Sequence, residues 1–246
     1  GFEFGPGKGV VVGADTGARD IRVVDSSFSG TLGFDAVGTH GDDLLIAGNV
    51  CAASGSSVGT QGHCFYVSNG RRIRLLWNVG GGVPGYGIHI FDQQRSSNDI
   101  RRRISDVLVE GNRLSGSSER SGLILAMGDE GNLGNAIAGV RVRGNTFTAN
   151  NHSGIIVGER VSNVIIERNR FVRNGRQGIT VADEATIDGI TIRANLFDQS
   201  ANANCRNSCE WYPVAHVQVG AKAGRVVLSG NTFRPKPVVV IGALPR

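Results

Sequence analysis

Long hydrophobic runs are missing from this chain of 246 residues, and no stretch approaches the roughly 18 to 20 consecutive apolar residues that a membrane-spanning helix needs. Methionine occurs once, and β-branched residues far outnumber helix formers, which argues against a helical bundle. Hydrophobic residues still make up 40% of the chain and charged residues 19%, which excludes a disordered protein. Together with 37 glycines for tight turns, this composition predicts an all-β protein with many short strands.

Lysine is also scarce, because only Lys8, Lys222 and Lys236 are present among 26 basic residues. The formal net charge of +5 is too small to predict nucleic-acid binding, and we expect none. Nearly all the positive charge is therefore guanidinium, the group that binds carboxylates through two parallel hydrogen bonds. This favours an acidic ligand.

The sequence has no CxxC or HExxH spacing, so a zinc site is not expected. Its four cysteines form two local pairs, Cys51 with Cys64 and Cys205 with Cys209, which would suit an oxidising compartment. A buried free thiol at Cys51 is the alternative. The chain starts without an apolar signal stretch, and we expect a secreted, extracellular or periplasmic protein whose export signal has been removed.

A repeat runs through the chain: alternating β-branched residues, a small or charged residue, Asn, any residue, and then Phe or Leu. The clearest copies are VLVEGNRL, VRVRGNTF, VIIERNRF, ITIRANLF and VVLSGNTF, and each contains one of the asparagines Asn112, Asn145, Asn169, Asn195 and Asn231. A second short strand precedes each copy. Units of this length bury their apolar side only by stacking as the coils of a solenoid. Asn is expected to adopt the left-handed bend and to bond to the Asn of the next coil, with the Phe filling the interior.

On these repeats the chain resembles the right-handed parallel β-helix family, the pectate-lyase-like superfamily. The resemblance implies a single domain over residues 1–246, with about eight coils and an asparagine ladder. The family includes lyases, hydrolases, epimerases, esterases, tail spikes and non-catalytic proteins, so the function must be argued from the site. In this family the strand before the Asn turn belongs to the second sheet, and the outer face of the first sheet usually carries polysaccharide sites.

Alternation along YGIHIF places Ile88 and Ile90 inward and His89 outward on the first sheet. The same reasoning points Tyr66 and Asp35 outward in the two preceding coils, so the three side chains should form one exposed column. Long loops in coils four and five are expected to wall a cleft beside it.

Tyr66 and His89 have the chemistry for an acid and a base that act on a sugar carbon, with arginine neutralising a uronate carboxylate. The alternative is that both are ordinary surface residues of a sheet. Asp35 and Asp92 would orient the pair or bind calcium, the one cofactor considered. The residues expected to bind an acidic polysaccharide are Arg95, Arg101, Arg102, Arg103, Asp129, Glu130, Trp211 and Tyr212.

The segment from Tyr86 to Gln93 is similar to the neighbourhood of the catalytic motif in alginate C5-epimerases, without its Asp-Pro-His. The run from His40 to Asp43 is superficially similar to polygalacturonase motifs, without their remaining pattern. The favoured function is β-elimination by a polysaccharide lyase. The alternatives are a glycoside hydrolase with paired carboxylates and a non-catalytic carbohydrate-binding solenoid of the adhesin or tail-spike type. The remaining histidines are expected to be solvated or capping groups, and Trp77 to pack as core or rim.

Overall fold

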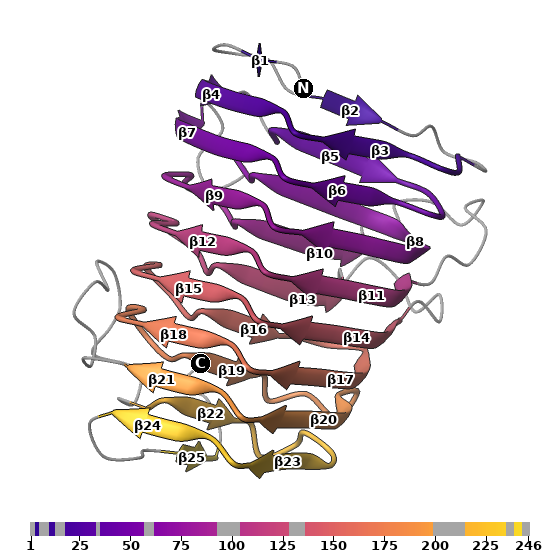
Figure 1. Ribbon diagram of the computed structural model, residues 1–246. Coiled ribbons are helices and arrows are strands. Elements are labelled where there is room, and N and C mark those ends of the chain that lie inside the picture. The colour runs from indigo at the N-terminus through magenta and orange to yellow at the C-terminus, as the bar shows by residue number, and fades with distance from the viewer. Residues whose placement is uncertain are drawn as a thin grey trace.

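The computed structural model describes residues 3–4, 10–12, 18–32, 35–56, 62–92, 104–127, 136–198, 215–234 and 239–242. All regular secondary structure in these ranges is β-strand, and strands of successive coils pair in parallel. The coils stack one above another from the N-terminal to the C-terminal end (Figure 1). The predicted all-β parallel solenoid is therefore confirmed.

Each coil contributes strands to three sheets, here numbered by their order in the coil. The first sheet contains β2 (Val10–Val12), β5 (Val37–His40), the start of β8 (Phe65–Leu76), β10 (Ile88–Asp92), β13 (Leu123–Met127), β16 (Ile155–Val157), β19 (Ile179–Val181), β22 (Val217–Val219) and β25 (Val239–Ile241).

The second sheet contains β3 (Arg22–Val24), β6 (Leu45–Ala47), the end of β8, β11 (Ile104–Glu110), β14 (Ile137–Arg143), β17 (Val161–Glu167), β20 (Asp188–Arg193) and β23 (Val226–Ser229). Because β8 runs around the bend, the first two sheets share one hydrogen-bonded ladder. The third sheet contains β1 (Glu3–Phe4), β4 (Ser27–Leu32), β7 (Val50–Ser56), β9 (Val79–Gly81), β12 (Arg113–Ser115), β15 (Thr146–Thr148), β18 (Arg170–Val172), β21 (Leu196–Asp198) and β24 (Thr232–Arg234).

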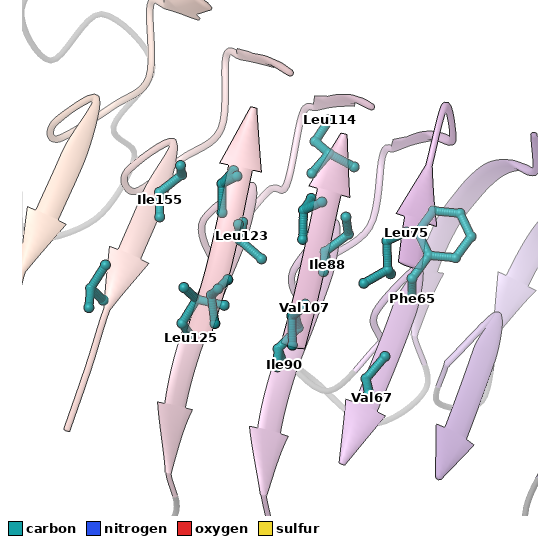
Figure 2. Packing of buried hydrophobic residues seen from close by; sticks show 14 of the residues in the cluster. Phe65, Val67, Leu75, Ile88, Ile90, Val107, Leu114, Leu123, Leu125 and Ile155 are labelled. Carbon is teal, nitrogen blue, oxygen red and sulfur yellow. The ribbon is translucent and has the colours of Figure 1, made fainter. Parts of the chain in front are cut away.

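The core fills the space that the sheets enclose. Side chains alternate along each strand, so Val107 and Val109 of β11 are buried while Leu108 between them is partly exposed. Figure 2 shows aliphatic side chains of neighbouring strands, such as Ile88 and Leu123, packed together in this interior. The outward-facing residues of the strands are thus not needed for the core and can serve in a functional site.

Buried asparagines stack at the corner between the second and third sheets. The Nδ2 of Asn112 donates to the Oδ1 of Asn145 at 2.9 Å, and Asn145 donates to Asn169 in the same way at 3.0 Å. The same bond links the other neighbours in the series Asn49, Asn78, Asn112, Asn145, Asn169, Asn195 and Asn231. These bonds therefore fix how the corner of each coil aligns with the corner of the next.

The left-handed bend was expected at the asparagine itself, and this expectation is wrong. Positive φ occurs one residue earlier, as at Gly144 (64°), Arg168 (55°) and Ala194 (53°). The Asn can then point inward, where its backbone N–H also donates to the next Asn, as from Asn145 to Asn169 at 2.9 Å. Bending and bonding are therefore divided between two adjacent residues.

Two residues after each of the last four asparagines of the stack, the expected phenylalanine is present. Phe147, Phe171, Phe197 and Phe233 stack with ring centroids 5.2, 4.8 and 5.0 Å apart. Cys51 holds this position in an earlier coil, and it forms a disulfide with Cys64 rather than staying a free thiol. The sulfur of Cys64 also lies beside Gly80, whose coil offers no side chain there.

Trp77 was expected to pack as core or rim, but its residue is 63% exposed. Its φ of 54° turns it out of the corner, and its indole lies over Gly111 of the next coil, where a Cβ would be 2.4 Å from the ring.

The described part of the chain contains no helix with the length and apolar character needed to span a membrane.

Candidate functional site

The outer face of the first sheet aligns Tyr66 of β8 with His89 of β10, and His89 with Ile124 of β13. The column continues through Ile156, Thr180 and Gln218. This is the register that the alternation predicts, and it brings the proposed acid and base into neighbouring coils.

Asp35 was expected in the same column, but the structure places it elsewhere. Strand β5 begins at Val37, which pairs with Phe65, so Gly38 is the residue opposite Tyr66. Asp35 precedes the strand and aligns with His63, because the backbone N–H of Ala36 donates to the His63 carbonyl at 2.9 Å. The sequence pattern placed the start of this strand too early.

The rings of Tyr66 and His89 belong to a larger cluster, which we call the ring cluster: His63, Tyr66, Tyr86, His89 and Phe91. The His89 centroid lies 4.3 Å from that of His63, 5.0 Å from Tyr66, 4.8 Å from Tyr86 and 4.9 Å from Phe91. Its four neighbours come from β8, β10 and the turns before them. The imidazole of His89 is therefore the centre of an aromatic enclosure.

His89 is only 7% exposed, which corrects the expectation of an exposed column. Burial lowers the pKa of His89 well below its usual value, and the nearby His63 and Arg120 add to this effect. Within the described part of the chain, its Nδ1 has no hydrogen-bond partner. His89 is consequently a neutral imidazole whose Nδ1 is buried without a partner among the described residues.

His63 was expected to be a solvated or capping residue, yet it is buried in the ring cluster. Its Nδ1 accepts the Tyr86 backbone N–H at 2.9 Å, which fixes the ring and keeps this nitrogen unprotonated. Burial lowers the pKa of His63 to about 4. This hydrogen bond therefore holds the His63 ring and the Tyr86 backbone in place relative to each other.

Asp35 lies at the edge of the ring cluster, beside His63. Burial raises the pKa of Asp35 to about 7, although its carboxyl accepts a hydrogen bond from the His63 backbone. Its Oδ1 is buried without a partner among the residues that the structure describes. A carboxyl with this pKa exchanges protons near neutrality, which suits a general acid or base.

The two phenols of the cluster have different partners. The Tyr66 hydroxyl donates to the Phe91 carbonyl at 3.2 Å. The Arg120 guanidinium lies 5.9 Å from the Tyr86 ring centre and hydrogen-bonds this side chain, while burial raises the pKa of Tyr86. Arg120 is thus a cation at the edge of the ring cluster.

A cavity of about 420 Å³ begins at Phe91 and extends along the first sheet towards the C-terminal coils. Small residues form its floor, since Ala126 is opposite Phe91 and a Cβ at Gly158 would meet Ala126 at 2.7 Å. Glu159 and Glu184 also line it. This cavity offers space for a sugar chain beside the ring cluster.

Buried polar residues lie farther along the first sheet, in the later coils. Ser153 Oγ lies 2.7 Å from Thr180 Oγ1, and the Thr180 hydroxyl donates to Gln177 at 3.0 Å. Gln218 in the next coil is fully buried, and neither side-chain amide atom has a partner among the described residues. Along the outer column of the first sheet, the residues therefore change from aromatic rings to isoleucines and then to hydroxyl and amide groups.

Several of the expected site residues lie outside the described residues: Arg95, Arg101, Arg102, Arg103, Asp129, Glu130, Trp211 and Tyr212. The same holds for the predicted pair of Cys205 and Cys209. The backbone of Asp92 ends β10, opposite Met127. The described residues contain no group of three or more His, Cys, Asp or Glu arranged to hold a metal.

The two carboxyls in the run from His40 to Asp43 are engaged in ion pairs. Asp42 forms an ion pair with Arg71 at 2.8 Å, and Asp43 forms one with Arg72 at 2.5 Å. Hydrogen bonds from these guanidinium groups lower the pKa of both carboxyls. Both therefore stay ionised and paired next to the second sheet.

Sequence reasoning missed His63, Arg120 and the role of Tyr86. A signal was present for two of them, because His63 and Tyr86 each stand two residues before the first inward residue of their strands, Phe65 and Ile88. Arg120 lies in a turn and has no such repeat position.

The structure is similar to the A-module of a mannuronan C-5 epimerase from Azotobacter vinelandii, with a TM-score of 0.50 and 14% identity over 90% of this chain and 64% of that chain. The tailspike protein of Acinetobacter baumannii phage AM24 has a TM-score of 0.43 and 14% identity, over 98% of this chain and 47% of that chain. The periplasmic alginate epimerase AlgG has a TM-score of 0.37 and 14% identity, over 90% of this chain and 68% of that chain.

This chain thus spans less than two thirds of the first two of these proteins. No curated protein sequence matches it. Residues 47–233 match the family model described as the right handed beta helix region, and the chain belongs to the right-handed β-helix family.

Proposed function

We propose that the ring cluster is the reaction centre of a secreted enzyme that acts on a uronate-containing polysaccharide by β-elimination. The observation that carries the proposal is the 5.0 Å separation of the Tyr66 and His89 ring centroids, which lie in adjacent coils. The Nδ1 of His89 is buried and has no hydrogen-bond partner among the described residues. A base and a phenolic acid in this arrangement meet the two proton transfers of the reaction.

The proposed step begins when the base removes the proton next to the uronate carboxylate. The C–H electrons form the double bond between C4 and C5, the C4–O4 bond breaks, and a phenol protonates the leaving oxygen. His89 is the proposed base, with Tyr66 as the acid and Tyr86 as a second phenol. Asp35 assists as a proton-exchanging carboxyl.

Arginine supplies the charge that the carboxylate needs as the carbanion develops. Arg120 lies beside Tyr86, and Arg95 and Arg101 to Arg103 remain proposed neutralisers. Asp92 remains a proposed orienting group or calcium ligand. Acidic polysaccharide binding by Asp129, Glu130, Trp211 and Tyr212 also belongs to this proposal.

Two further observations support it. The fold likeness includes a protein named for epimerising mannuronan, a polyuronate, and epimerisation shares the first proton abstraction with elimination. The disulfide between Cys51 and Cys64 supports an oxidising compartment and hence secretion.

The test incubates the protein with a panel of acidic polysaccharides, with and without a chelator, and follows the ultraviolet absorbance of unsaturated uronates. His89→Gln and Tyr66→Phe should each lower the rate about 10²- to 10⁴-fold. His216→Gln is the matched control, because His216 is a buried histidine of another coil and should leave the rate unchanged. Unchanged rates in both cluster variants would sink the proposal.

A second arm runs the reaction in D₂O and follows deuterium at C5 by NMR. Exchange without unsaturated product would indicate epimerisation instead of elimination. Hydrolysis needs a second carboxylate facing Asp35, and it would release saturated reducing ends.

The burial of His89, at 7% exposure, favours a second candidate: a non-catalytic carbohydrate-binding β-helix. This candidate predicts binding of the polysaccharide without any product in either arm.

A further inference from the structure

A second cavity, of about 380 Å³, lies on the outer face of the second sheet, away from the ring cluster. Strands β8, β11, β14 and β17 form its floor. Its charged lining contains three arginines, Arg74, Arg141 and Arg143, and a single aspartate, Asp106. The excess of guanidinium groups favours an anionic ligand.

The three arginines differ in how far their hydrogen-bonding capacity is used. Arg74 donates to the carbonyl and carboxylate of Asp106 at 2.8 and 3.0 Å. Arg143 donates to Glu110 at 2.9 Å. Arg74 is therefore largely committed to Asp106. Arg143 is held by Glu110, and its Nε is buried away from solvent.

Arg141 is different, because it makes no hydrogen bond to any residue that the structure describes. Its ion pair with Glu167 spans 3.7 Å, and Glu167 is already held by Arg193 at 2.7 Å. The side chain of Arg141 is 47% exposed. Its planar fork is thus available to receive a carboxylate through two parallel bonds.

The surroundings of Arg141 suit a sugar ring better than a small inorganic anion. Leu108 and Ile165 pair with Arg141 from the neighbouring strands, and both are partly exposed. They provide apolar surface on each side of the guanidinium, where the C–H face of a pyranose can pack. Asn163 lines the same cavity with an exposed side-chain amide, and Gly139 beside it leaves the wall open.

We infer that this cavity is a second carbohydrate site, which binds a carboxylated sugar such as a uronate residue through Arg141. The carboxylate bonds to the guanidinium fork, the ring lies on Leu108 and Ile165, and a hydroxyl bonds to Asn163. The site makes no contribution to chemistry, and it anchors an acidic chain on a face of the solenoid that differs from the reaction face. It can exist whether or not the ring cluster is catalytic.

The experiment titrates ¹⁵N-labelled protein with tetragalacturonate and follows the amide shifts of Leu108, Arg141 and Ile165. These amides should move, and Arg141→Gln should weaken the affinity that they report by about tenfold or more. Shifts near Tyr66 report the ring cluster separately, so failure of the proposed reaction and failure of this site are distinguishable.

Arg170→Gln is the matched control. Arg170 is likewise exposed and has a loose ion pair, 3.9 Å from Asp198, but it lies on the third sheet. Its replacement should leave the affinity unchanged. Titrations with cellotetraose and with sulfate complete the test, and neither should move the three amides comparably.

The inference is overturned if Arg141→Gln binds tetragalacturonate as tightly as the unmodified protein. It is also overturned if cellotetraose binds equally well, or if sulfate reproduces the same shifts with the same affinity, which would indicate a simple anion site.

Discussion

Individual ionisable groups of the ring cluster are controlled mainly by burial. Burial disfavours the charged form of any group, so it raises the pKa of Asp35 and lowers that of His63. Both are therefore uncharged in much of the acidic range, and Asp35 changes charge near neutrality. A site that is rich in titratable residues thus has little charge of its own.

The raised pKa of Asp35 makes a prediction about stability. Below its ordinary pKa of 3.8 the carboxyl is protonated in both the folded and unfolded chains, and it adds nothing to the pH dependence. Between there and about 7 the unfolded chain ionises Asp35 while the folded chain keeps it protonated, so stability falls as pH rises. Asp35→Asn removes this loss, and it should gain stability relative to the unmodified protein between about pH 4 and about pH 7.

Urea unfolding at several pH values measures this difference. Asp20→Asn is the control, because Asp20 is exposed and Asn tolerates its left-handed φ of 55°. A stability gap between Asp35→Asn and the unmodified protein that stays constant across this range would contradict the expected shift.

At the scale of the elements, the asparagine stack makes the corner between the second and third sheets specific. Asn145 accepts two hydrogen bonds from Asn112 and donates to Val109, Arg143 and Asn169. Loss of the side chain leaves buried backbone and amide groups without partners, each at a cost of about 1–3 kcal/mol.

Asn145→Ala should therefore destabilise the protein by about 3 kcal/mol or more. Asn231→Ala should cost clearly less, because Asn231 is only partly buried and, in the described residues, ends the stack. Chemical denaturation of the two variants compares them directly. Equal losses in the free energy of unfolding would mean that the burial of an asparagine does not determine how much it stabilises the protein.

The strands and corners of the solenoid could be predicted because each is repeated. The alternation in the YGIHIF segment placed His89 opposite Tyr66 correctly, since both strands begin where their apolar pattern begins. The pattern failed for Asp35, because β5 begins only at Val37, two residues later. It also assigned the bend to Asn, because a repeat motif does not show which of two adjacent residues takes the positive φ.

The site itself was harder to predict for a physical reason. Alternation shows which way a side chain points and not whether other groups then cover it. His89 points outward as expected, but four rings enclose it and bury it. Arg120 comes from a turn, where no periodicity shows its position relative to Tyr86.

Across the whole molecule, each coil contacts mainly its two neighbours, so damage should remain local. The disulfide between Cys51 and Cys64 links β7 to the residue that precedes β8, next in sequence to His63 of the ring cluster. Its removal should cost about 3 kcal/mol, the value typical of a loop of this size.

Replacing both cysteines with alanine should speed amide hydrogen exchange in β8 and β10, while β17 and β20 keep their protection. Mass spectrometry of peptides from these strands measures the difference. Uniformly faster exchange along the chain would show instead that the coils unfold as a single cooperative unit.

The buried amides of the corner all face the same way. From Asn49 to Asn195, each Nδ2 donates one hydrogen bond to the Oδ1 of the next asparagine towards the C-terminal end, so every Oδ1 from Asn78 to Asn231 accepts from the N-terminal side. Aligned amide dipoles reinforce one another, so this column gives the solenoid an electrical direction along its axis, with the partial positive end at Asn231. An ion would therefore meet a different local field at the two ends of this asparagine column.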